Sequence, residues 1–283
     1  MGKRFLAVAA GAALLTLPAL AGNIVLTGHD DDFHYDGSGS TTVAGDPGTQ
    51  LSEMLVFARA GSADPTLPVL SFDIPGGELV SSLTGILGAG GFTNIDPSVA
   101  GNVTDALFDP TKYSAIVVAS DESCGGCDLN ATDEANISAH AAAIGTFFDG
   151  GGGIVGLAGA EQAGIGYYKF VPAAAGGFGS PPSSGYFQTA DGLAAGIDAV
   201  NGDATHNFFF EPGTGGVSSA YKVFERLTDP AGGIGTAETI GCTGCTVAII
   251  TGGTPEPASI VLFGSVLLGL AGLTKFQRRA RKS

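Results

Sequence analysis

The sequence predicts a single α/β domain of three layers, in which a mostly parallel sheet lies between two layers of helices. Short apolar runs alternate with helical patterns through residues 23–251, as in chains that wind helices around a sheet. The clearest run, residues 113–119, is continuous, β-branched and uncharged, as a central parallel strand should be. Apolar residues make up 44% of the 283, so a core can form despite 47 glycines.

Each element follows from its local pattern. Strands are expected at 23–28, 68–72, 92–95, 113–119, 154–157, 205–210, 221–227 and 246–251. Helices are expected at 47–60, 78–87 and 132–148, the last with Thr132 as N-cap and acidic residues in its first turn. Residues 172–185, rich in Ala, Gly, Pro and Ser, are expected to form a loop or flap. No linker divides the body, so residues 22–253 are expected to form one domain.

The N-terminal segment has the pattern of a secretory signal peptide. Lys3 and Arg4 precede an apolar run at residues 5–17, and Ala19-Leu20-Ala21 offers small residues at positions −3 and −1 of a cleavage site. We expect a signal peptidase to remove residues 1–21 by cutting between Ala21 and Gly22. The alternative is an uncleaved anchor helix, for which the apolar run is short.

The charges are strongly segregated along the chain. Seven of the twelve basic residues lie near the two ends, and residues 22–254 carry 26 acidic and 5 basic side chains, a formal charge of −21. Phosphate binding requires clustered Lys and Arg, so this body excludes nucleic acid as a partner.

The C-terminal segment has three parts. The sequence Pro255-Glu256-Pro257 is followed by the uncharged residues 258–274 and then by a basic cluster at 275–282. Seventeen residues of helix span about 25 Å, which suits a thin or adapted bilayer. The pattern predicts a transmembrane helix at 258–274, with the basic cluster cytoplasmic and the acidic body on the other side of the membrane.

This ending resembles the PEP-CTERM sorting signal of Gram-negative bacteria, with Pro255, Glu256 and Pro257 as the signature. The resemblance implies an exosortase as partner, anchoring in the inner membrane before processing, and then a location at the cell surface or outside the cell. Sorted proteins of this family are associated with exopolysaccharide and biofilm. The alternative, an ordinary membrane anchor, explains the helix and the charges but not the Pro-Glu-Pro motif.

The body resembles the flavodoxin-like fold of the class I glutamine amidotransferases, particularly its ThuA-like branch. The resemblance rests on residues 23–29, 113–118 and 147–157, which match the first strand, the strand before the long helix, and the helix, glycine turn and elbow strand. In that family a Cys nucleophile follows the elbow strand and a later His-x-Glu pair activates it. Here Ala158 stands at the Cys position and His206-Asn207-Phe208 lacks the Glu. The resemblance therefore implies the fold without glutamine hydrolysis, and no catalytic residue is assigned.

The most charged cluster, residues 28–34, contains His29, three consecutive aspartates and His34. It is expected at the carboxyl end of the first strand, where open parallel sheets bind ligands. Oxygen ligands alone suit calcium or magnesium, and inclusion of imidazoles suits zinc. The candidate ligands of such a divalent cation are His29, Asp30, Asp32, His34 and His206. The alternative is a solvated acidic loop.

Four cysteines form two C-x-x-C pairs, Cys124 with Cys127 and Cys242 with Cys245. Export to an oxidising compartment favours a disulfide within each pair. A cross-link between the pairs, a Cys₄ zinc site and a redox role remain open alternatives.

These observations favour an exported surface or matrix protein with a non-catalytic body. Its expected partners are a signal peptidase, an exosortase, the membrane and an exopolysaccharide. The first alternative is a metal-dependent hydrolase of extracellular carbohydrate or amide substrates that uses the acidic cluster at residues 29–34. The second is a structural component stabilised by calcium, in which Asp30 to Asp32 support folding only.

Overall fold

The computed structural model of the chain describes residues 21–34, 47–122, 128–164, 166–179, 184–201, 205–229 and 233–245, together with residues 182 and 231. The chain divides into two compact units, Met1–Val247 and Ala248–Ser283. The described residues all belong to the first unit. The predicted Pro-Glu-Pro motif, the predicted membrane helix at 258–274 and residues 1–20 of the predicted signal peptide lie outside them.

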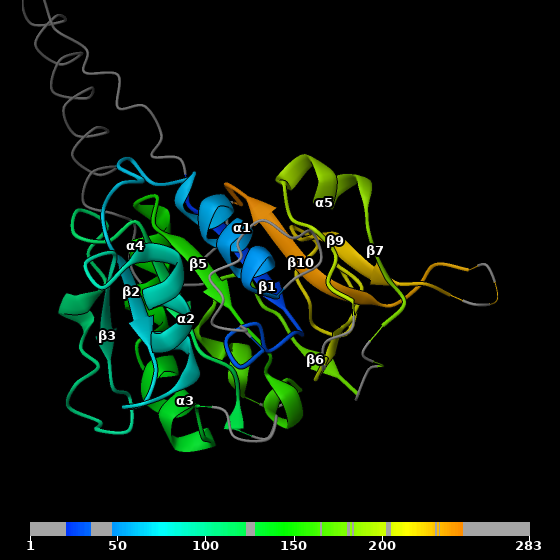
Figure 1. Ribbon diagram of the computed structural model, residues 1–283. Helices are drawn as coiled ribbons and strands as arrows, with labels where there is room; N and C mark the ends of the chain where they lie inside the picture. The colour runs from blue at the N-terminus through cyan, green and yellow to red at the C-terminus, as the bar shows by residue number, and fades with distance from the viewer. Residues whose placement is uncertain are drawn as a thin grey trace, which may run out of the picture. The chain divides into compact units, whose positions relative to one another are not determined.

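Strands and helices alternate in the first part of the body (Figure 1). The strands are β1 (Asn23–Thr27), β2 (Val69–Phe72), β3 (Phe92–Ile95), β4 (Ala115–Val118), β5 (Gly153–Gly156), β6 (Gly177–Phe178), β7 (Tyr186–Gln188), β8 (Phe208–Phe209), β9 (Lys222–Leu227) and β10 (Ala237–Thr243). The α-helices are α1 (Pro47–Arg59), α2 (Glu78–Leu87), α3 (Ala131–Ser138), α4 (Ala141–Asp149) and α5 (Ala190–Ala195). Short 3₁₀ helices are η1 (Asp105–Leu107), η3 (Ala160–Gln162) and η4 (Tyr167–Phe170).

The centre of the sheet is parallel. Strands β3, β2, β4, β5 and β1 lie side by side in that order and all run in the same direction. The strand predicted to be central, β4, lies in the middle of this block and is buried along its whole length. The α/β class and the parallel central sheet are therefore confirmed.

Beyond β1 the sheet continues with antiparallel strands. Strand β10 pairs with the whole length of β1 through its residues 239–243, and β8, β6, β9 and β7 complete this part of the sheet. All five residues of β1 are buried, because strands flank β1 on both sides and the sheet is covered on both faces. Its sequence, Asn-Ile-Val-Leu-Thr, is accordingly mostly apolar.

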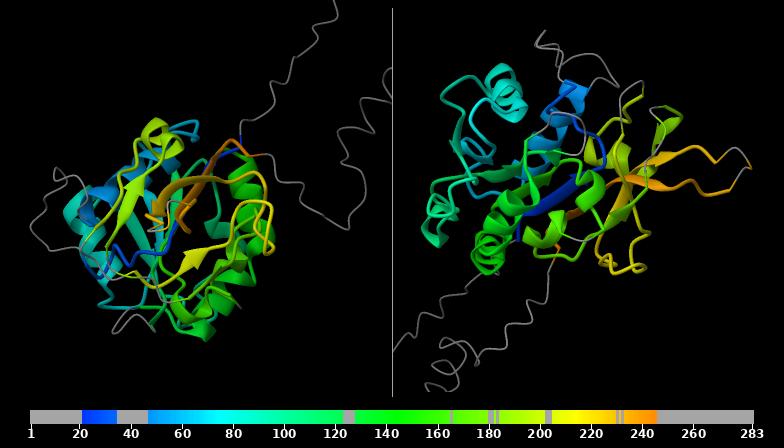
Figure 2. Two further views of the ribbon diagram at one scale, coloured as in Figure 1. Left: turned by 90° about the vertical axis from the view of Figure 1, so that its right-hand side faces the viewer. Right: turned by 90° about the horizontal axis from the view of Figure 1, so that it is seen from below.

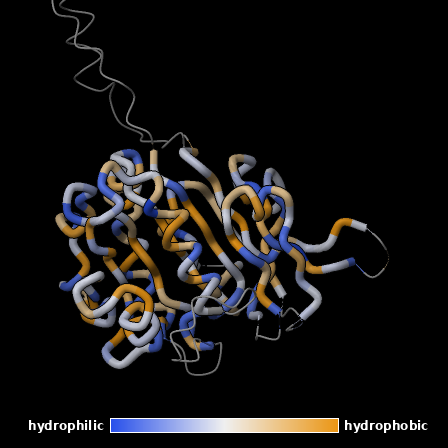
Figure 3. Tube along the Cα trace, turned by 45° about the horizontal axis from the view of Figure 1, so that its top comes forward, coloured by the Kyte–Doolittle hydropathy of each residue, from blue (hydrophilic) through white to orange (hydrophobic). Residues whose placement is uncertain are grey.

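Helices cover the parallel block on both faces, which gives three layers (Figure 2, left). Residues three apart on a strand point to opposite faces. On β5, a side chain at Gly153 would meet Ala58 of α1, whereas one at Gly156 would approach Phe170 of η4. Helix α2 contacts α1 on the first face, and α3 and α4 contact η4 on the second. Hydrophobic residues accordingly concentrate on the strands between these layers (Figure 3).

The helix predicted at 132–148 is two helices, α3 and α4, which meet near His140. The predicted N-cap, Thr132, is wrong. Asn130 is the cap, because its side chain accepts hydrogen bonds from the backbone N–H groups of Thr132 and Asp133. In turn, the Asp133 carboxylate accepts a hydrogen bond from the Asn130 backbone N–H.

The C-terminal strands differ most from expectation. Strand β10 was not predicted, because Glu238 and Gly241 interrupt its apolar pattern, and α5, β6 and β7 were missed as well. Strand β6 lies within the segment 172–185, which was expected to be a loop or flap. The strand expected at 205–210 shortens to β8, with an isolated bridge between Thr205 and His29. The strand expected at 246–251 lies outside the described residues. Within the described part of the chain, no helix has the length and apolar character that crossing a bilayer requires.

Candidate metal centre

The loop that follows β1 folds back on itself. The backbone N–H groups of Phe33 and His34 both donate to the carbonyl oxygen of Asp30, at 3.0 and 3.2 Å. This turn places the imidazole of His34 beside the carboxylate of Asp30, four residues earlier. The loop lies at the carboxyl end of β1, as the sequence predicted.

A close approach of two backbones brings His206 to the same place. The His206 N–H donates to the Gly28 carbonyl at 2.9 Å, and residues 29 and 205 form a β-bridge. A Cβ on Gly28 would lie 1.7 Å from the Asn207 carbonyl oxygen, so only glycine permits this approach. The segment before β8 therefore lies directly against the end of β1.

One oxygen of Asp30 lies between the two imidazoles. Asp30 Oδ2 is 3.0 Å from His206 Nε2 and 3.4 Å from His34 Nε2, and the three ligand atoms all lie within 4.8 Å of one another. Ligand atoms of a tetrahedral zinc ion, each about 2.0 Å from the metal, lie about 3.3 Å apart. Asp30 is fully buried, whereas the His34 and His206 side chains are 32% and 19% exposed. The three residues therefore form a compact set of nitrogen and oxygen ligands, in which the ligand atom His206 Nε2 is buried and the His34 side chain is the most exposed part.

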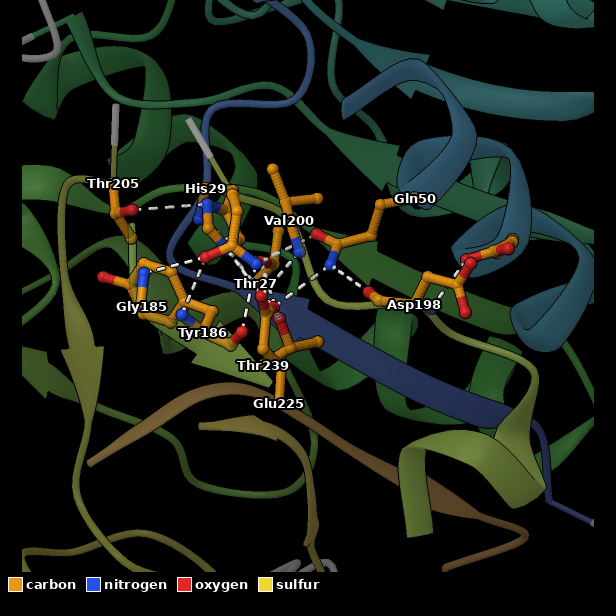
Figure 4. Close-up of polar contacts among 12 residues, drawn as sticks. Thr27, His29, Gln50, Gly185, Tyr186, Asp198, Val200, Thr205, Glu225 and Thr239 are labelled. Atoms are coloured by element: carbon orange, nitrogen blue, oxygen red, sulfur yellow. Dashed lines mark hydrogen bonds and ion pairs between the residues drawn. The ribbon is translucent and has the colours of Figure 1, made fainter. Parts of the chain in front are cut away.

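Two of the predicted ligands are not part of this set. His29 points the other way and is fully buried, with Nε2 at 3.2 Å from both carboxylate oxygens of Glu225 (Figure 4). Its Nδ1 lies 3.4 Å from the hydroxyl of Thr205. Because both ring nitrogens have partners inside the protein, the prediction of His29 as a metal ligand is not supported by its position.

Glu225 is the centre of a buried polar network. Its carboxylate accepts hydrogen bonds from the side chains of Gln50 and Thr239 and from the backbone of Val200 (Figure 4). The contacts from Thr205 to His29 and from His29 to Glu225 have the arrangement of a catalytic triad, in which a hydroxyl nucleophile contacts a base and an acid orients the base. Thr205 is only 6% exposed, however, and the hydroxyl-to-imidazole distance is long for a hydrogen bond. The network is better explained as the support that holds the ends of β1, β9 and β10 together.

Asp32 also turns away from the candidate centre. Its carboxylate accepts hydrogen bonds from the backbone and hydroxyl of Ser120, which follows β4, at 2.9 and 2.7 Å. Burial raises the pKa of Asp32, against the opposing effect of these hydrogen bonds. Asp32 therefore connects the loop to the neighbouring strand end.

Sequence reasoning missed two further buried acids near Asp32. Burial, with the nearby carboxylates, raises the pKa of Asp73 to about 7 and that of Asp128 to about 8. Asp73 directly follows β2, and its position after a buried strand was the available signal. Asp128 accepts the N–H of Glu78 at the start of α2, so it joins that helix to the carboxyl edge of the sheet.

The turn after β5 carries no nucleophile. Ala158 is fully buried there, and its N–H donates to the His29 carbonyl at 3.1 Å. At the opposite end of β1, Ala21 and Gly22 are buried, and the Gly22 N–H donates to the Phe148 carbonyl.

A disulfide joins Cys242 and Cys245 at the end of β10, which confirms the predicted pairing within the second C-x-x-C motif. The first pair, Cys124 and Cys127, lies outside the described residues.

Comparison with known proteins adds no functional evidence. No protein-family model matches the chain, and no match was found among curated proteins or solved structures.

Proposed function

We propose that this chain is an exported surface protein whose α/β domain binds a divalent transition-metal ion through Asp30, His34 and His206. The observation that carries the proposal is the convergence of both imidazoles on one buried carboxylate oxygen, from two segments far apart in the sequence. Two imidazoles and one carboxylate suit zinc or ferrous iron better than calcium, which prefers six to eight oxygen ligands. We take zinc as the first candidate.

Export is the other part of the proposal. It is supported by the signal-peptide pattern of residues 1–21, by the PEP-CTERM-like ending and by the Cys242–Cys245 disulfide, since disulfides persist mainly in oxidising compartments. An exosortase would then process the C-terminal signal, and the acidic body would reside at the cell surface or in an exopolysaccharide matrix.

The proposal also includes a flavodoxin-like fold for the body. Flavodoxin-like sheets have the strand order 2-1-3-4-5. The sheet here has the order β3-β2-β4-β5-β1. If β1 is left out of the count, the remaining four strands have the order 2-1-3-4, and β1, the first strand of the chain, takes the fifth place. The amidotransferase-like branch is supported less, because Ala158 replaces the nucleophile that defines its chemistry.

Metal-dependent hydrolysis is the second candidate function. Three protein ligands would leave a coordination position of a bound zinc ion free for water. A substrate would approach it from the side of His34, whose side chain is the more exposed of the two imidazoles, because His206 Nε2 itself is buried. A zinc-bound water with a lowered pKa would be the nucleophile that the amino-acid side chains do not supply.

Metal analysis tests the first proposal. The full-length chain is purified without chelator, its metal content is measured by mass spectrometry, and its melting temperature is compared before and after EDTA and after zinc is added back. We expect about one zinc per chain and a melting temperature that falls with EDTA and recovers with zinc, because a metal that binds only the folded state stabilises it. The proposal would be refuted if the purified protein contained no metal and its melting temperature did not change when zinc was added.

A further inference from the structure

A pocket of about 430 Å³ lies between α3 and the two 3₁₀ helices η3 and η4, apart from the candidate metal centre. Pockets of about 300–1,000 Å³ hold small molecules. Among the described residues, its polar lining comes from Glu134 and Ser138 of α3, Gln162 of η3 and Lys169 of η4.

Two polar atoms beneath this pocket lack hydrogen-bond partners. Glu134 is only 4% exposed, and its Oε1 atom is buried without a partner, as is the hydroxyl oxygen of Ser138. Burial, together with a hydrogen bond to the neighbouring carboxylate of Asp121, raises the pKa of Glu134 to about 9. The Glu134 carboxyl is therefore neutral at pH 7, and unsatisfied polar atoms of this kind are costly unless a ligand or water completes them.

Lys169 gives the pocket a positive charge in a strongly acidic body. Three of the other basic side chains in residues 22–254 have partners: Lys112 pairs with Asp109, Arg226 pairs with Glu211, and Arg59 donates to Ser114 and to a backbone carbonyl. Lys169 is exposed and forms no ion pair with any carboxylate in the described part of the chain. An anionic group on a ligand would find its counterion here.

We infer that this pocket binds a small polyhydroxylated carboxylate of about the size of one hexuronic acid, with the carboxylate on Lys169 and the hydroxyl groups on Glu134, Ser138 and Gln162. A sugar hydroxyl both donates and accepts hydrogen bonds, and these three side chains offer both roles within one pocket. The ammonium group selects the acidic sugar over the neutral one. No residue of this site belongs to the candidate metal centre, so the two proposals stand independently.

Calorimetric titration of the full-length chain tests the inference, with sodium D-glucuronate as the probe and D-glucose and sodium acetate as comparisons. We expect glucuronate to bind at least about tenfold more tightly than either comparison, because each lacks one of the two recognised features. Lys169→Gln should lower the affinity for glucuronate to that for glucose, and Ser138→Ala should weaken glucuronate binding. Lys112→Gln, which removes a lysine elsewhere on the surface, should change neither.

Three results would overturn the inference. The first is that glucuronate does not bind, and the second is that it binds the Lys169→Gln variant as tightly as the parent chain. The third is that acetate binds as tightly as glucuronate, which would indicate a site for small anions only. Melting curves of the variants show whether each is folded, and Lys169 is exposed, so its replacement should leave the melting temperature unchanged. Titration in the presence of EDTA keeps the result separate from the metal proposal.

Discussion

His206 Nε2 lies 3.0 Å from Asp30 Oδ2, a contact between the segment before β8 and the loop after β1. The contact forms only when the two segments pack against each other. The His206 backbone is held by the carbonyl of Gly28, and Asp30 is held by the turn that also carries His34. The ligand set therefore depends on the pairing of distant backbone segments, and its chemistry can be tested separately from its geometry.

Replacement of His206 by Ala should remove one ligand of the metal. We expect the affinity for Co²⁺, used as a spectroscopic substitute for zinc, to fall by more than about 100-fold, because loss of a direct ligand exceeds the 10–100-fold cost of losing an outer-shell contact. The visible absorption of bound Co²⁺ measures this. His140→Ala is the matched control, since His140 contacts Asp105 at the surface. Equal Co²⁺ affinity in the two variants would contradict the site.

Gly28→Ala should disturb the same site through the backbone. The new methyl group would overlap the Asn207 carbonyl oxygen and also lie 2.4 Å from Glu238 Oε1. We expect a loss of about 3 kcal/mol in the free energy of unfolding and weaker metal binding, measured by urea denaturation and Co²⁺ titration. Gly90→Ala is the control, because nothing lies within 4 Å of its added Cβ. If both variants unfold alike, the close approach is not what holds His206 in place.

The parallel half of the fold could be predicted from the sequence. Its strands are short, apolar and separated by amphipathic helices, so β1, β2, β4 and β5 each have a local signal. Strand β10 could not be predicted in the same way. Two of its residues, Glu238 and Thr239, are polar and yet fully buried. Thr239 belongs to the Glu225 network, which exists only in the folded sheet, and burial raises the pKa of Glu238.

The candidate site was predicted in part. Its position after β1 followed from the parallel sheet, and Asp30, His34 and His206 were among the expected ligands. Which members of the cluster would converge could not be predicted, since the turn at Asp30 sends consecutive side chains in different directions. His29 points to Glu225, and Asp32 points to Ser120.

Glu225→Ala should destabilise the domain strongly. The change leaves His29, Gln50 and Thr239 without their buried acceptor, and the backbone N–H of Val200 loses its partner as well. We expect a loss of about 3–5 kcal/mol by urea denaturation. Glu211→Ala removes a carboxylate from an ion pair with Arg226 at the surface and should cost less than about 1 kcal/mol. A cost for Glu225→Ala as small as this control would show that the network contributes little to stability.

Replacement of Cys242 and Cys245 by Ser should have a modest effect. The disulfide closes a loop with a sequence separation of 3, and loop-closure entropy predicts a contribution of only about 2 kcal/mol. The double variant isolates this bridge, whereas a reductant acts on every cystine in the chain. Urea denaturation under non-reducing conditions measures the difference. A loss well above this value would mean that the bridge also fixes the pairing of β10 with β1.

The buried acids predict how stability depends on pH. Burial raises the pKa of Asp73, Asp128 and Glu134 to about 7, 8 and 9, above the values of about 4 expected in the unfolded chain. The folded state therefore binds more protons than the unfolded state between about pH 4 and pH 9. Their contribution to stability is fully present below pH 4 and is lost as the pH rises through the folded values. We expect the free energy of unfolding, measured in urea with EDTA present, to fall from pH 5 to pH 9.

Asp128→Asn tests the origin of this pH dependence. The amide has nearly the same shape as the protonated carboxyl group but cannot ionise, so the variant should lose less stability between pH 5 and pH 9 than the parent chain. Each tenfold difference in proton affinity corresponds to about 1.4 kcal/mol, and we expect at least that much less loss in the variant. Asp191→Asn, at an exposed position, should leave the profile unchanged. Parallel profiles for the parent and Asp128→Asn would mean that Asp128 is ionised in the folded protein, which would require a cation or another partner beside it.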